Sequence, residues 1–277
     1  MSFKPTISVH ATPQELSAAG CRKIVEIIEA SGSQQWPLSI ALAGGSTPKM
    51  TYARLHDEHL NLLREKRALR FFMGDERMVP ADSTDSNYNM AREVLLHDIP
   101  DDLVFPFDTS AVTPSAEATS ADAMRVAEAY GKQLASLLPL KSVGEAGPKV
   151  PVFDVVLLGL GSDGHTASIF PGSQAEKETD GKVVVSVGFP SETMKPKVWR
   201  VTLSPATIMQ ARNVIVLATG AEKKWVVDGI LADTAHKAPV ARFLRGCEGN
   251  VSFLLDKEIA ENLAKFGGSL EHHHHHH

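Results

Sequence analysis

Two titratable side chains, Asp163 and His165, lie in a glycine-rich stretch that directly follows an apolar segment. The apolar run Phe153–Leu158 predicts a strand buried on both faces, as in a parallel sheet. The glycines of the next segment, Gly159–Gly164, let the backbone turn tightly and approach a ligand closely. Parallel α/β sheets bind their ligands at the carboxyl ends of the strands, so we expect the chemistry at this turn. An imidazole titrates near pH 6.5, which suits a general base at neutral pH.

The same segment allows two other interpretations. Gly159–Gly164 matches the dinucleotide-binding pattern GxGxxG. That pattern needs a long helix after its third glycine, whereas Pro171 and Gly172 leave room for only about two turns. The segment also begins past the middle of the chain, and a nucleotide-binding strand usually opens its domain. The structural alternative is a glycine turn whose histidine makes only local hydrogen bonds. We favour a catalytic loop, and we expect no nucleotide or other cofactor.

A second glycine loop, Gly44-Gly45-Ser46-Thr47, follows the predicted strand Leu38–Ala43. The two glycines free backbone N–H groups to converge, and the two hydroxyls add donors. A helix that begins after such a loop offers a binding site for phosphate. The GxxxxGK[ST] spacing of a nucleotide P-loop is absent. The alternative is an ordinary strand-to-helix turn with a Ser or Thr cap, and we favour the phosphate site.

Three charged residues, Asp75, Glu76 and Arg77, follow a third predicted strand, Arg70–Gly74. Charges at the end of a buried strand are unusual unless they face a crevice. Arg77 could hold a carboxylate of the site or face an anionic ligand. The alternative for all three residues is an ion-pair network on the surface.

Two further cations occupy unusual positions. Arg200 lies in a predicted strand, Lys197–Leu203, that is otherwise largely apolar. Burying an unpaired guanidinium is costly, so we expect Arg200 to face an anion or a carboxylate. Lys223 lies in the first turn of a predicted helix, Gly220–Leu231, where a cation opposes the helix dipole. A bound anion would explain this position; a lysine that faces solvent is the alternative.

The composition excludes several classes of protein. The chain has 277 residues, 43% of them hydrophobic, and a net charge of −5 without a basic stripe, which argues against nucleic acid as a partner. No apolar run approaches the length of a membrane span, and the first residues lack the layout of a signal peptide. The two cysteines suit a reducing compartment. We expect a soluble cytoplasmic protein that does not bind membranes.

Residues 270–277, Leu-Glu followed by six histidines, are identified as an expression tag. A targeting signal at the natural C-terminus would be hidden if the tag replaced it. None of the remaining histidines is spaced with other ligands as in a metal site. His56 and His59, with acidic residues between them, are typical of a solvated helix face. We therefore expect no metal.

Strands and helices alternate almost throughout, which predicts a single α/β domain over residues 1–269, built on a mainly parallel, Rossmann-like layered sheet with helices on both faces. Residues 108–122 and 144–151 are expected to be irregular. The predicted helices include Pro13–Ala30, one that starts at Ser86-Asn87, Ala121–Leu138, a short one at Ser204-Pro205, and Lys257–Phe266. Further predicted strands are Ile7–His10, Val183–Val187, Asn213–Ala218 and Val251–Leu255.

Several of these segments together resemble one family. Leu42–Pro48, Gly74–Arg77 and Gly159–Ser168 are similar to segments of the glucosamine-6-phosphate isomerase/6-phosphogluconolactonase family, and Arg200 and Gly220–Lys223 extend the match. Each segment alone is a weak signal, but the set in this order is specific. Within the family the chain resembles the lactonase branch.

The sister branch can be distinguished by residue. A deaminating isomerase of this family would carry Tyr after Asp-Glu, and Phe-Asn-Glu-Pro shortly after the histidine. Here Arg77 and Ser168–Pro171 occupy those places, and Phe170 stands where the isomerase has its ring-opening glutamate. Asp75, which supplies the base in the isomerase branch, is retained, so the isomerase remains an alternative. A second alternative is a phosphosugar-binding regulator without turnover, against which the presence of His165 argues.

The resemblance implies hydrolysis of 6-phospho-D-glucono-1,5-lactone to 6-phospho-D-gluconate, a step of the oxidative pentose phosphate pathway. A lactone is an activated ester, so a water activated by His165 and charge stabilisation suffice. Asp163 or Asp75 would orient the imidazole, and the sequence does not choose between them. Arg77 is the candidate for stabilising the oxyanion, together with N–H groups of the glycine loop.

The resemblance also implies a phosphate site made by the loop Gly44 to Thr47, with Arg200 and Lys223 neutralising the charge. The expected partner is therefore a small phosphorylated sugar lactone, and neither a cofactor nor a metal is implied. The oligomeric state stays open, with a monomer favoured.

Overall fold

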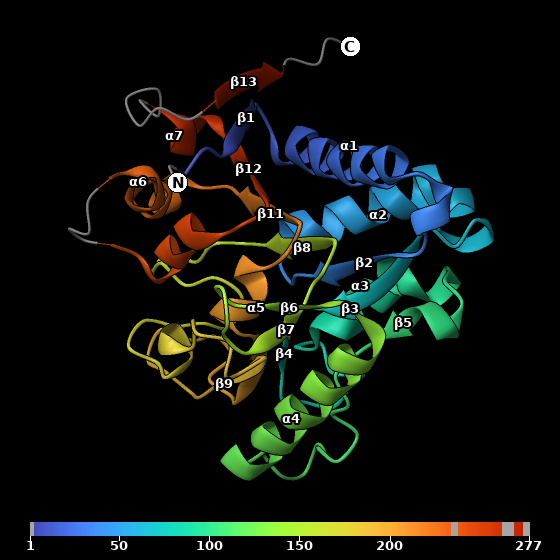
Figure 1. Cartoon of the computed structure of the whole chain (residues 1–277), viewed down its shortest axis with the longest axis vertical. Coiled ribbons are helices and arrows are strands. Elements are labelled where there is room, and N and C mark those ends of the chain that lie inside the picture. The colour runs from blue at the N-terminus through green and yellow to red at the C-terminus, as the bar shows by residue number, and fades with distance from the viewer. Residues whose placement is uncertain (1–2, 234–237, 262–268, 274–277) are drawn as a thin grey trace.

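The computed structural model describes residues 3–233, 238–261 and 269–273. Its centre is a sheet in which every pair of neighbouring strands is parallel (Figure 1). In spatial order the strands are β13 (Ser269–His273), β1 (Thr6–His10), β12 (Asn250–Asp256), β11 (Asn213–Ala218), β8 (Val155–Leu158), β2 (Leu38–Leu42), β3 (Leu69–Met73) and β5 (Val104–Phe105).

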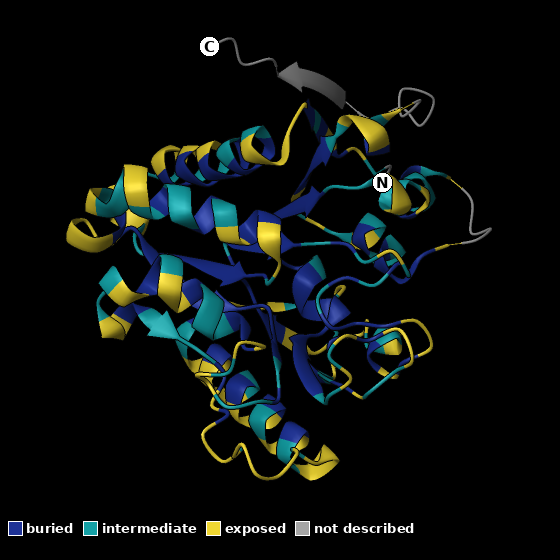
Figure 2. Cartoon of the chain, turned by 180° about the vertical axis from the view of Figure 1, so that it is seen from behind, coloured by how far each residue is buried: buried dark blue, intermediate teal, exposed yellow. Residues whose placement is uncertain are grey.

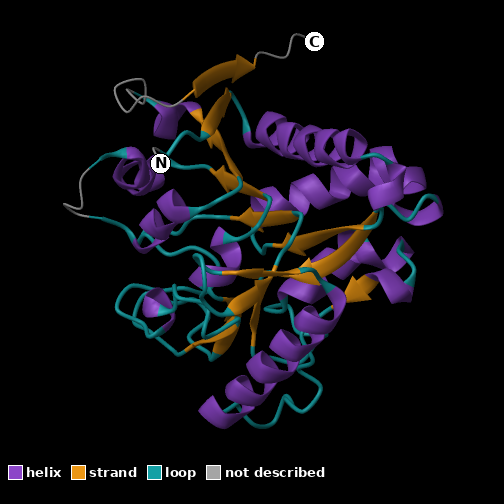
Figure 3. Ribbon diagram, in the orientation of Figure 1, coloured by secondary structure: helices purple, strands orange, loops and turns teal. Residues whose placement is uncertain are grey.

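Helices cover both faces of this sheet. The α-helices are α1 (Pro13–Ser31), α2 (Ser46–Leu60), α3 (Asn87–Val94), α4 (Ser120–Leu137), α5 (Pro205–Met209), α6 (Lys224–Leu231) and α7 (Lys257–Ala260). Helices α1 and α2 lie on one side of the sheet, whereas α5 and α6 lie on the other (Figures 1 and 3). Within the described ranges, no helix has both the length and the apolar character needed to cross a membrane.

The predicted fold class is confirmed, because the central strands have the burial that a covered parallel sheet requires. Every residue of β2 and of β8 is buried. Figure 2 shows the strands as a buried layer, with exposed residues on the outer sides of the helices. At the start of α1, Thr12 accepts a hydrogen bond from the backbone N–H of Glu15, as an N-cap residue does.

A second, antiparallel sheet was not predicted. It has three strands in the order β4 (Asp75–Arg77), β10 (Arg200–Leu203) and β9 (Val185–Gly188), and α4 packs against it. Gly74 ends the pairing of β3, and the chain then leaves the parallel sheet, so the three charges belong to a strand of their own. The residues before Arg200 that were predicted as strand form a loop instead.

Three further segments differ from prediction. Residues 144–151 are not wholly irregular, because β6 (Leu140–Ser142) and β7 (Lys149–Pro151) form a two-stranded ribbon. Helix α7 ends at Ala260 and Glu261 lies in a turn, whereas residues 262–266 of the predicted terminal helix lie outside the described residues. Strand β13 contains residues assigned to the tag, and it pairs with β1 to become the edge of the sheet. An unpaired strand edge offers a row of N–H and C=O groups to any extended segment.

Candidate active site

One cavity of about 370 Å³ lies where β2, β8 and β11 end, at the carboxyl edge of the parallel sheet. The small sheet contributes to its wall through β4 and β10. Of the ten candidate residues, nine line this cavity: Gly44, Gly45, Ser46, Thr47, Asp75, Arg77, His165, Arg200 and Lys223. The tenth, Asp163, contacts His165. The fold therefore brings the predicted catalytic and phosphate-binding residues to one place.

The imidazole of His165 is held by Asp163. Oδ1 of Asp163 lies 2.5 Å from Nδ1 of His165 and 3.0 Å from its backbone nitrogen. Oδ2 accepts a hydrogen bond of 2.7 Å from the hydroxyl of Thr193. Because an ionised carboxylate can only accept, His165 carries its hydrogen on Nδ1, which leaves a lone pair on Nε2.

Asp163 is ionised at neutral pH. Burial alone would raise the pKa of this carboxyl, but the hydrogen bonds from the side chain of His165, from Thr193 and from the backbone of His165 outweigh it and lower the pKa well below its ordinary value. Of the two carboxylates that could orient the imidazole, Asp163 is thus the one in contact. Asp75 accepts instead from the hydroxyl of Ser168, at 2.7 Å.

Close packing fixes the position of the imidazole. A Cβ on Gly161 would lie 2.1 Å from Nδ1 of His165, so only glycine permits this approach. The ring of Phe170, which is 2% exposed, stacks on the imidazole with centroids 4.2 Å apart. The guanidinium carbon of Arg200 lies 5.4 Å from the centroid of the same phenyl ring. Phe170 therefore packs against both a candidate catalytic residue and a candidate anion-binding residue.

The glycine loop after β2 leads directly into α2, which begins at Ser46. Gly45 is the N-cap residue and has a φ of 107°, a conformation that favours glycine. It offers no side chain to cap the helix, so the first N–H groups of α2 remain available to a ligand. Buried Tyr52 fixes the backbone before the loop, because its hydroxyl donates to the carbonyl of Ala43 and accepts from the N–H of the same residue.

Arg77 and Arg200 face each other across the antiparallel pair of β4 and β10. Arg77 Nη1 donates to the carbonyl of Asp85 at 2.7 Å, and Arg200 Nη2 donates to that of Pro196 at 2.9 Å. The Nε atom of each is buried and has no acceptor among the described residues. Burial, and then the charge of Arg77, lowers the pKa of Arg200 to about 10, so Arg200 is still a cation at neutral pH. A buried cation, Arg200, and a half-buried one, Arg77, each with an unsatisfied donor, are suited to an anion.

Glu76 has a different role from its neighbours, because alternate residues of a strand point to opposite sides. It is 2% exposed, and its carboxylate accepts hydrogen bonds from the backbone N–H groups of Arg77, Asn87 and Tyr88 at 2.8 to 2.9 Å. Burial raises the pKa of Glu76 to about 7, against the opposing effect of these N–H groups. The alternative of a surface ion-pair network is wrong for Glu76, which holds the start of α3 against β4.

Lys223 reaches the cavity from the end of β11. The predicted helix from Gly220 is divided into a 3₁₀ turn, Ala221–Lys223, and then α6. Lys223 is half-buried and lines the cavity, whereas the next residue, Lys224, forms an ion pair of 3.0 Å with Asp228. Lys223 is therefore available to a ligand in the cavity, whereas Lys224 is paired with a carboxylate of its own helix.

Sequence reasoning missed several residues of the site. Asn87 was expected only to help cap a helix, but it lines the cavity, as does Thr219. Thr193 lies in a loop without any recognisable pattern, so its contact with Asp163 could not have been anticipated. Phe170 was noticed only because it differs from the isomerase branch. After Gly164 the chain forms turns rather than a helix, so the dinucleotide interpretation fails.

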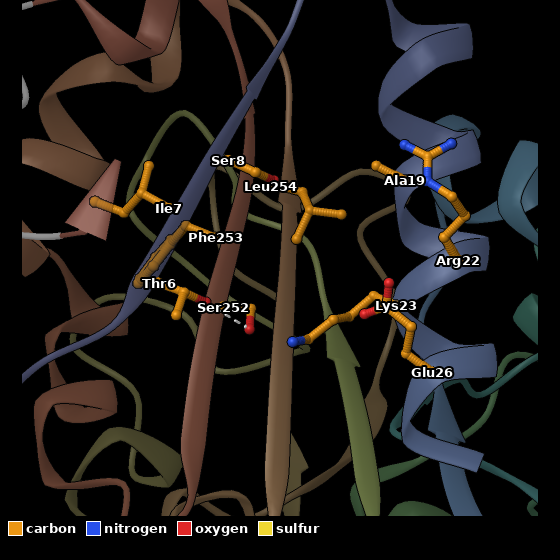
Figure 4. Close-up of a pocket in the computed structure, with 10 residues that line it drawn as sticks. All are labelled: Thr6, Ile7, Ser8, Ala19, Arg22, Lys23, Glu26, Ser252, Phe253 and Leu254. Carbon is orange, nitrogen blue, oxygen red and sulfur yellow. Dashed lines mark hydrogen bonds between the residues drawn. The ribbon is translucent and has the colours of Figure 1, made fainter. Parts of the chain in front are cut away.

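A different cavity, of about 330 Å³, lies between α1 and the strands β1 and β12 (Figure 4). Its charged side chains, Arg22, Lys23 and Glu26, come from α1, and a hydrogen bond of 2.9 Å joins Thr6 to Ser252 on the strands. None of the ten candidate residues, all within the described ranges, lines it. In the described part of the chain, the clusters with metal-ligating potential also lie elsewhere: Cys21, Glu58 and His59, and His56, His97 and Asp98.

Known proteins are similar to this chain over most of its length. The family described as glucosamine-6-phosphate isomerases/6-phosphogluconolactonase matches residues 11–253. The 6-phosphogluconolactonase of Synechocystis sp. is 38% identical over 228 residues, which cover 81% of this chain and 84% of that protein. Among solved structures, 6-phosphogluconolactonase from Trypanosoma cruzi is 63% identical with a TM-score of 0.91, covering 95% of this chain and 98% of that one. The corresponding structure from Leishmania guyanensis is 44% identical with a TM-score of 0.88, covering 94% and 99%. The chain therefore belongs to the glucosamine-6-phosphate isomerase/6-phosphogluconolactonase family.

Proposed function

We propose that this protein is a 6-phosphogluconolactonase, which hydrolyses 6-phospho-D-glucono-1,5-lactone to 6-phospho-D-gluconate. One observation carries the proposal. A single cavity is lined by the N-terminus of α2, by two arginines whose Nε atoms lack an acceptor among the described residues, and by an imidazole that an ionised carboxylate orients. The relatives at 30% identity or more that are described above carry this name.

His165 is the general base of the proposed reaction. With Nδ1–H donated to Asp163, the lone pair of Nε2 is the atom that can take a proton from water. The resulting hydroxide oxygen forms a bond to the lactone carbonyl carbon, and the carbonyl becomes a tetrahedral oxyanion. Asp163 stabilises the imidazolium that forms, as the orienting carboxylate of a histidine base does.

Collapse of the tetrahedral intermediate breaks the bond between the carbonyl carbon and the ring oxygen. The imidazolium returns its proton to that oxygen, which leaves as a hydroxyl, so His165 ends the cycle neutral. Arg77 is the group we assign to the oxyanion, together with N–H groups of the loop Gly159–Gly164. Asp75 lines the same cavity and offsets part of the positive charge of Arg77 and Arg200.

The phosphate of the substrate occupies the start of α2 in this proposal. The N–H groups and hydroxyls of Ser46 and Thr47 donate to its oxygens, and Gly44 and Gly45 allow the backbone to come close. Arg200 and Lys223 supply the opposite charge. Because the whole chain carries a net charge of −5, this local positive region is needed to attract an anionic sugar.

The test is lactone hydrolysis at neutral pH, corrected for the spontaneous rate in buffer. His165→Ala should lower kcat by a factor of about 10²–10⁴ while 6-phosphogluconate still binds, because the phosphate contacts remain. His59→Ala, a histidine outside the cavity, is the matched control. Turnover of His165→Ala at the rate of the parent would remove His165 from the mechanism.

The same protein preparation separates the alternatives. Release of ammonia from glucosamine 6-phosphate would support the isomerase. Binding of 6-phosphogluconate without any acceleration of lactone loss would support a regulator that lacks turnover. We expect neither, because Arg77 and Phe170 replace the residues of the isomerase branch and His165 is present.

A further inference from the structure

A cluster of metal-ligating side chains lies outside the active site, where α2 meets the turn after α3. His56 is on α2, and His97 and Asp98 lie in the 3₁₀ turn Leu96–Asp98. Their ligand atoms all lie within 4.8 Å of one another. No spacing pattern indicates this cluster, because His56 and Asp98 are 42 positions apart.

The two imidazoles direct the same ring nitrogen at one carboxylate oxygen. Oδ2 of Asp98 lies 2.6 Å from Nε2 of His56 and 3.1 Å from Nε2 of His97. The rings are stacked, with centroids 5.2 Å apart and planes inclined by 27°. Three ligand atoms from two elements thus converge on one point near the surface.

The other ring nitrogens fix the tautomers. Nδ1 of His97 lies 2.8 Å from the carbonyl oxygen of Arg92, and Nδ1 of His56 lies 3.1 Å from a carboxylate oxygen of Asp57. The carbonyl of Arg92 can only accept, so Nδ1 of His97 carries a hydrogen and a neutral His97 presents a lone pair at Nε2. His56 has a carboxylate at each ring nitrogen, and the hydrogen bonds to Asp98 and Asp57 raise its pKa, so an ion bound at its Nε2 would displace a proton. Metal-ligating histidines bind in this manner, with the second nitrogen donating to a carbonyl or a carboxylate.

The cluster therefore contains one ring nitrogen with a lone pair, on His97, and one ring nitrogen hydrogen-bonded to the carboxylate, on His56. Protonating His97 as well would stack two cations. A single divalent ion satisfies all three atoms at once. Around zinc, bonds of about 2.0–2.1 Å in tetrahedral geometry place neighbouring ligand atoms about 3.3 Å apart. The spacings of 2.6 Å and 3.1 Å to Asp98 would therefore widen by about 0.7 Å and 0.2 Å on binding.

We propose that His56 Nε2, His97 Nε2 and a carboxylate oxygen of Asp98 form a binding site for Zn²⁺ or a similar borderline divalent cation, with water in the fourth position. Two imidazoles and one carboxylate suit such an ion better than Ca²⁺ or Mg²⁺, which prefer oxygen ligands. The side chains of His56, His97 and Asp98 are 25%, 44% and 36% exposed, so an ion can enter from solvent. The site ties α2 to the turn that follows α3.

The experiment must remove a competing source of imidazole. We would use the full-length chain with His272 to His277 replaced by Ser and titrate it with ZnCl₂ by calorimetry. The expected result is one saturable ion per chain, with Co²⁺ giving the visible absorption bands of a low-coordinate site. His97→Ala and Asp98→Asn should weaken binding by at least the 10–100-fold that loss of an outer-shell partner costs. Zn²⁺ should raise the Tm of the parent but not that of either variant.

His59→Ala is the matched control, because His59 lies on the same helix but belongs to the cluster with Cys21 and Glu58. Far-UV circular dichroism and lactone turnover equal to the parent would show that the variants fold. The proposal is overturned if the parent binds no ion, if His97→Ala and Asp98→Asn bind as the parent does, or if His59→Ala loses the ion instead.

Discussion

The hydrogen bond between Asp163 and His165 gives the sharpest test of how the site works. Asp163→Asn keeps a carbonyl oxygen that can accept from Nδ1 and from the backbone N–H, but it removes the charge. A hydrogen bond to a charged group contributes about 1.5–3 kcal/mol and a neutral one about 0.5–1.5 kcal/mol. The difference, about 1–1.5 kcal/mol, corresponds to roughly a tenfold fall in kcat.

Asp163→Ala removes the whole interaction, so it should lower kcat by about 10- to 100-fold. Neither change should alter KM much, because Asp163 contacts His165 and does not line the cavity. The assay is initial-rate lactone hydrolysis over a range of substrate concentrations, with the buffer rate subtracted. Asp82→Asn, an exposed residue of a nearby loop, is the control for a change of charge alone.

Two results would refute this reasoning. An unchanged kcat in Asp163→Ala would mean that the carboxylate neither orients the imidazole nor stabilises its cation. A raised KM at constant kcat would mean that Asp163 acts in substrate binding. An equal fall in kcat in Asp163→Asn and Asp163→Ala would mean that Asp163 acts through its charge alone, because the asparagine keeps the hydrogen-bond geometry.

Three other predictions follow from contacts of the site. Lys223→Ala should raise KM for the phosphorylated lactone about tenfold and leave KM for an unphosphorylated lactone unchanged; equal effects on both substrates would contradict a phosphate contact. Gly161→Ala places a Cβ 2.1 Å from Nδ1 of His165, so kcat should fall at least tenfold. The control is Gly131→Ala in α4, where the nearest atom to the new Cβ is 3.7 Å away and kcat should stay unchanged. Glu76 has a pKa of about 7 in the folded protein, above the ordinary 4.5, so the folded state binds the proton more tightly than the unfolded state does. The contribution of Glu76 to the free energy of unfolding should therefore rise as the pH falls from 7 to 4.5. Glu76→Gln cannot titrate and should lack that slope in urea unfolding; an identical slope would exclude Glu76 as its source.

The parallel sheet could be predicted because its strands and helices have simple signatures. Val155–Leu158 is apolar throughout and Thr12 precedes an amphipathic helix, so pattern and local chemistry agree. Because ligands of parallel α/β sheets bind at the carboxyl ends of the strands, the two glycine loops that follow strands were expected at one crevice. The candidate residues of the two glycine loops reach the cavity for that reason, whereas Arg200 reaches it from the antiparallel sheet.

The parts that could not be predicted depend on contacts distant in sequence. Nothing in Asp75–Arg77 indicates a separate antiparallel strand, because its partner, Arg200–Leu203, lies more than a hundred residues later. The choice of Asp163 over Asp75 as partner of the imidazole likewise depends on side-chain geometry. Thr193 enters its cluster from a loop and His97 from a short 3₁₀ turn, where neither periodicity nor propensity restricts the position of a side chain.

The three residues of β4 serve two sides of one short strand, and this makes the strand intolerant of length changes. A one-residue insertion before Asp75 would reverse the direction of every following side chain. Glu76 would then enter the cavity as an anion at the place of Arg77, which we assign to the oxyanion, while Arg77 would turn to the side that faces the start of α3. Recognition of the sugar and anchoring of the helix would be lost in one event, so we expect relatives that retain this chemistry to vary in the loops around β4 and to keep its length.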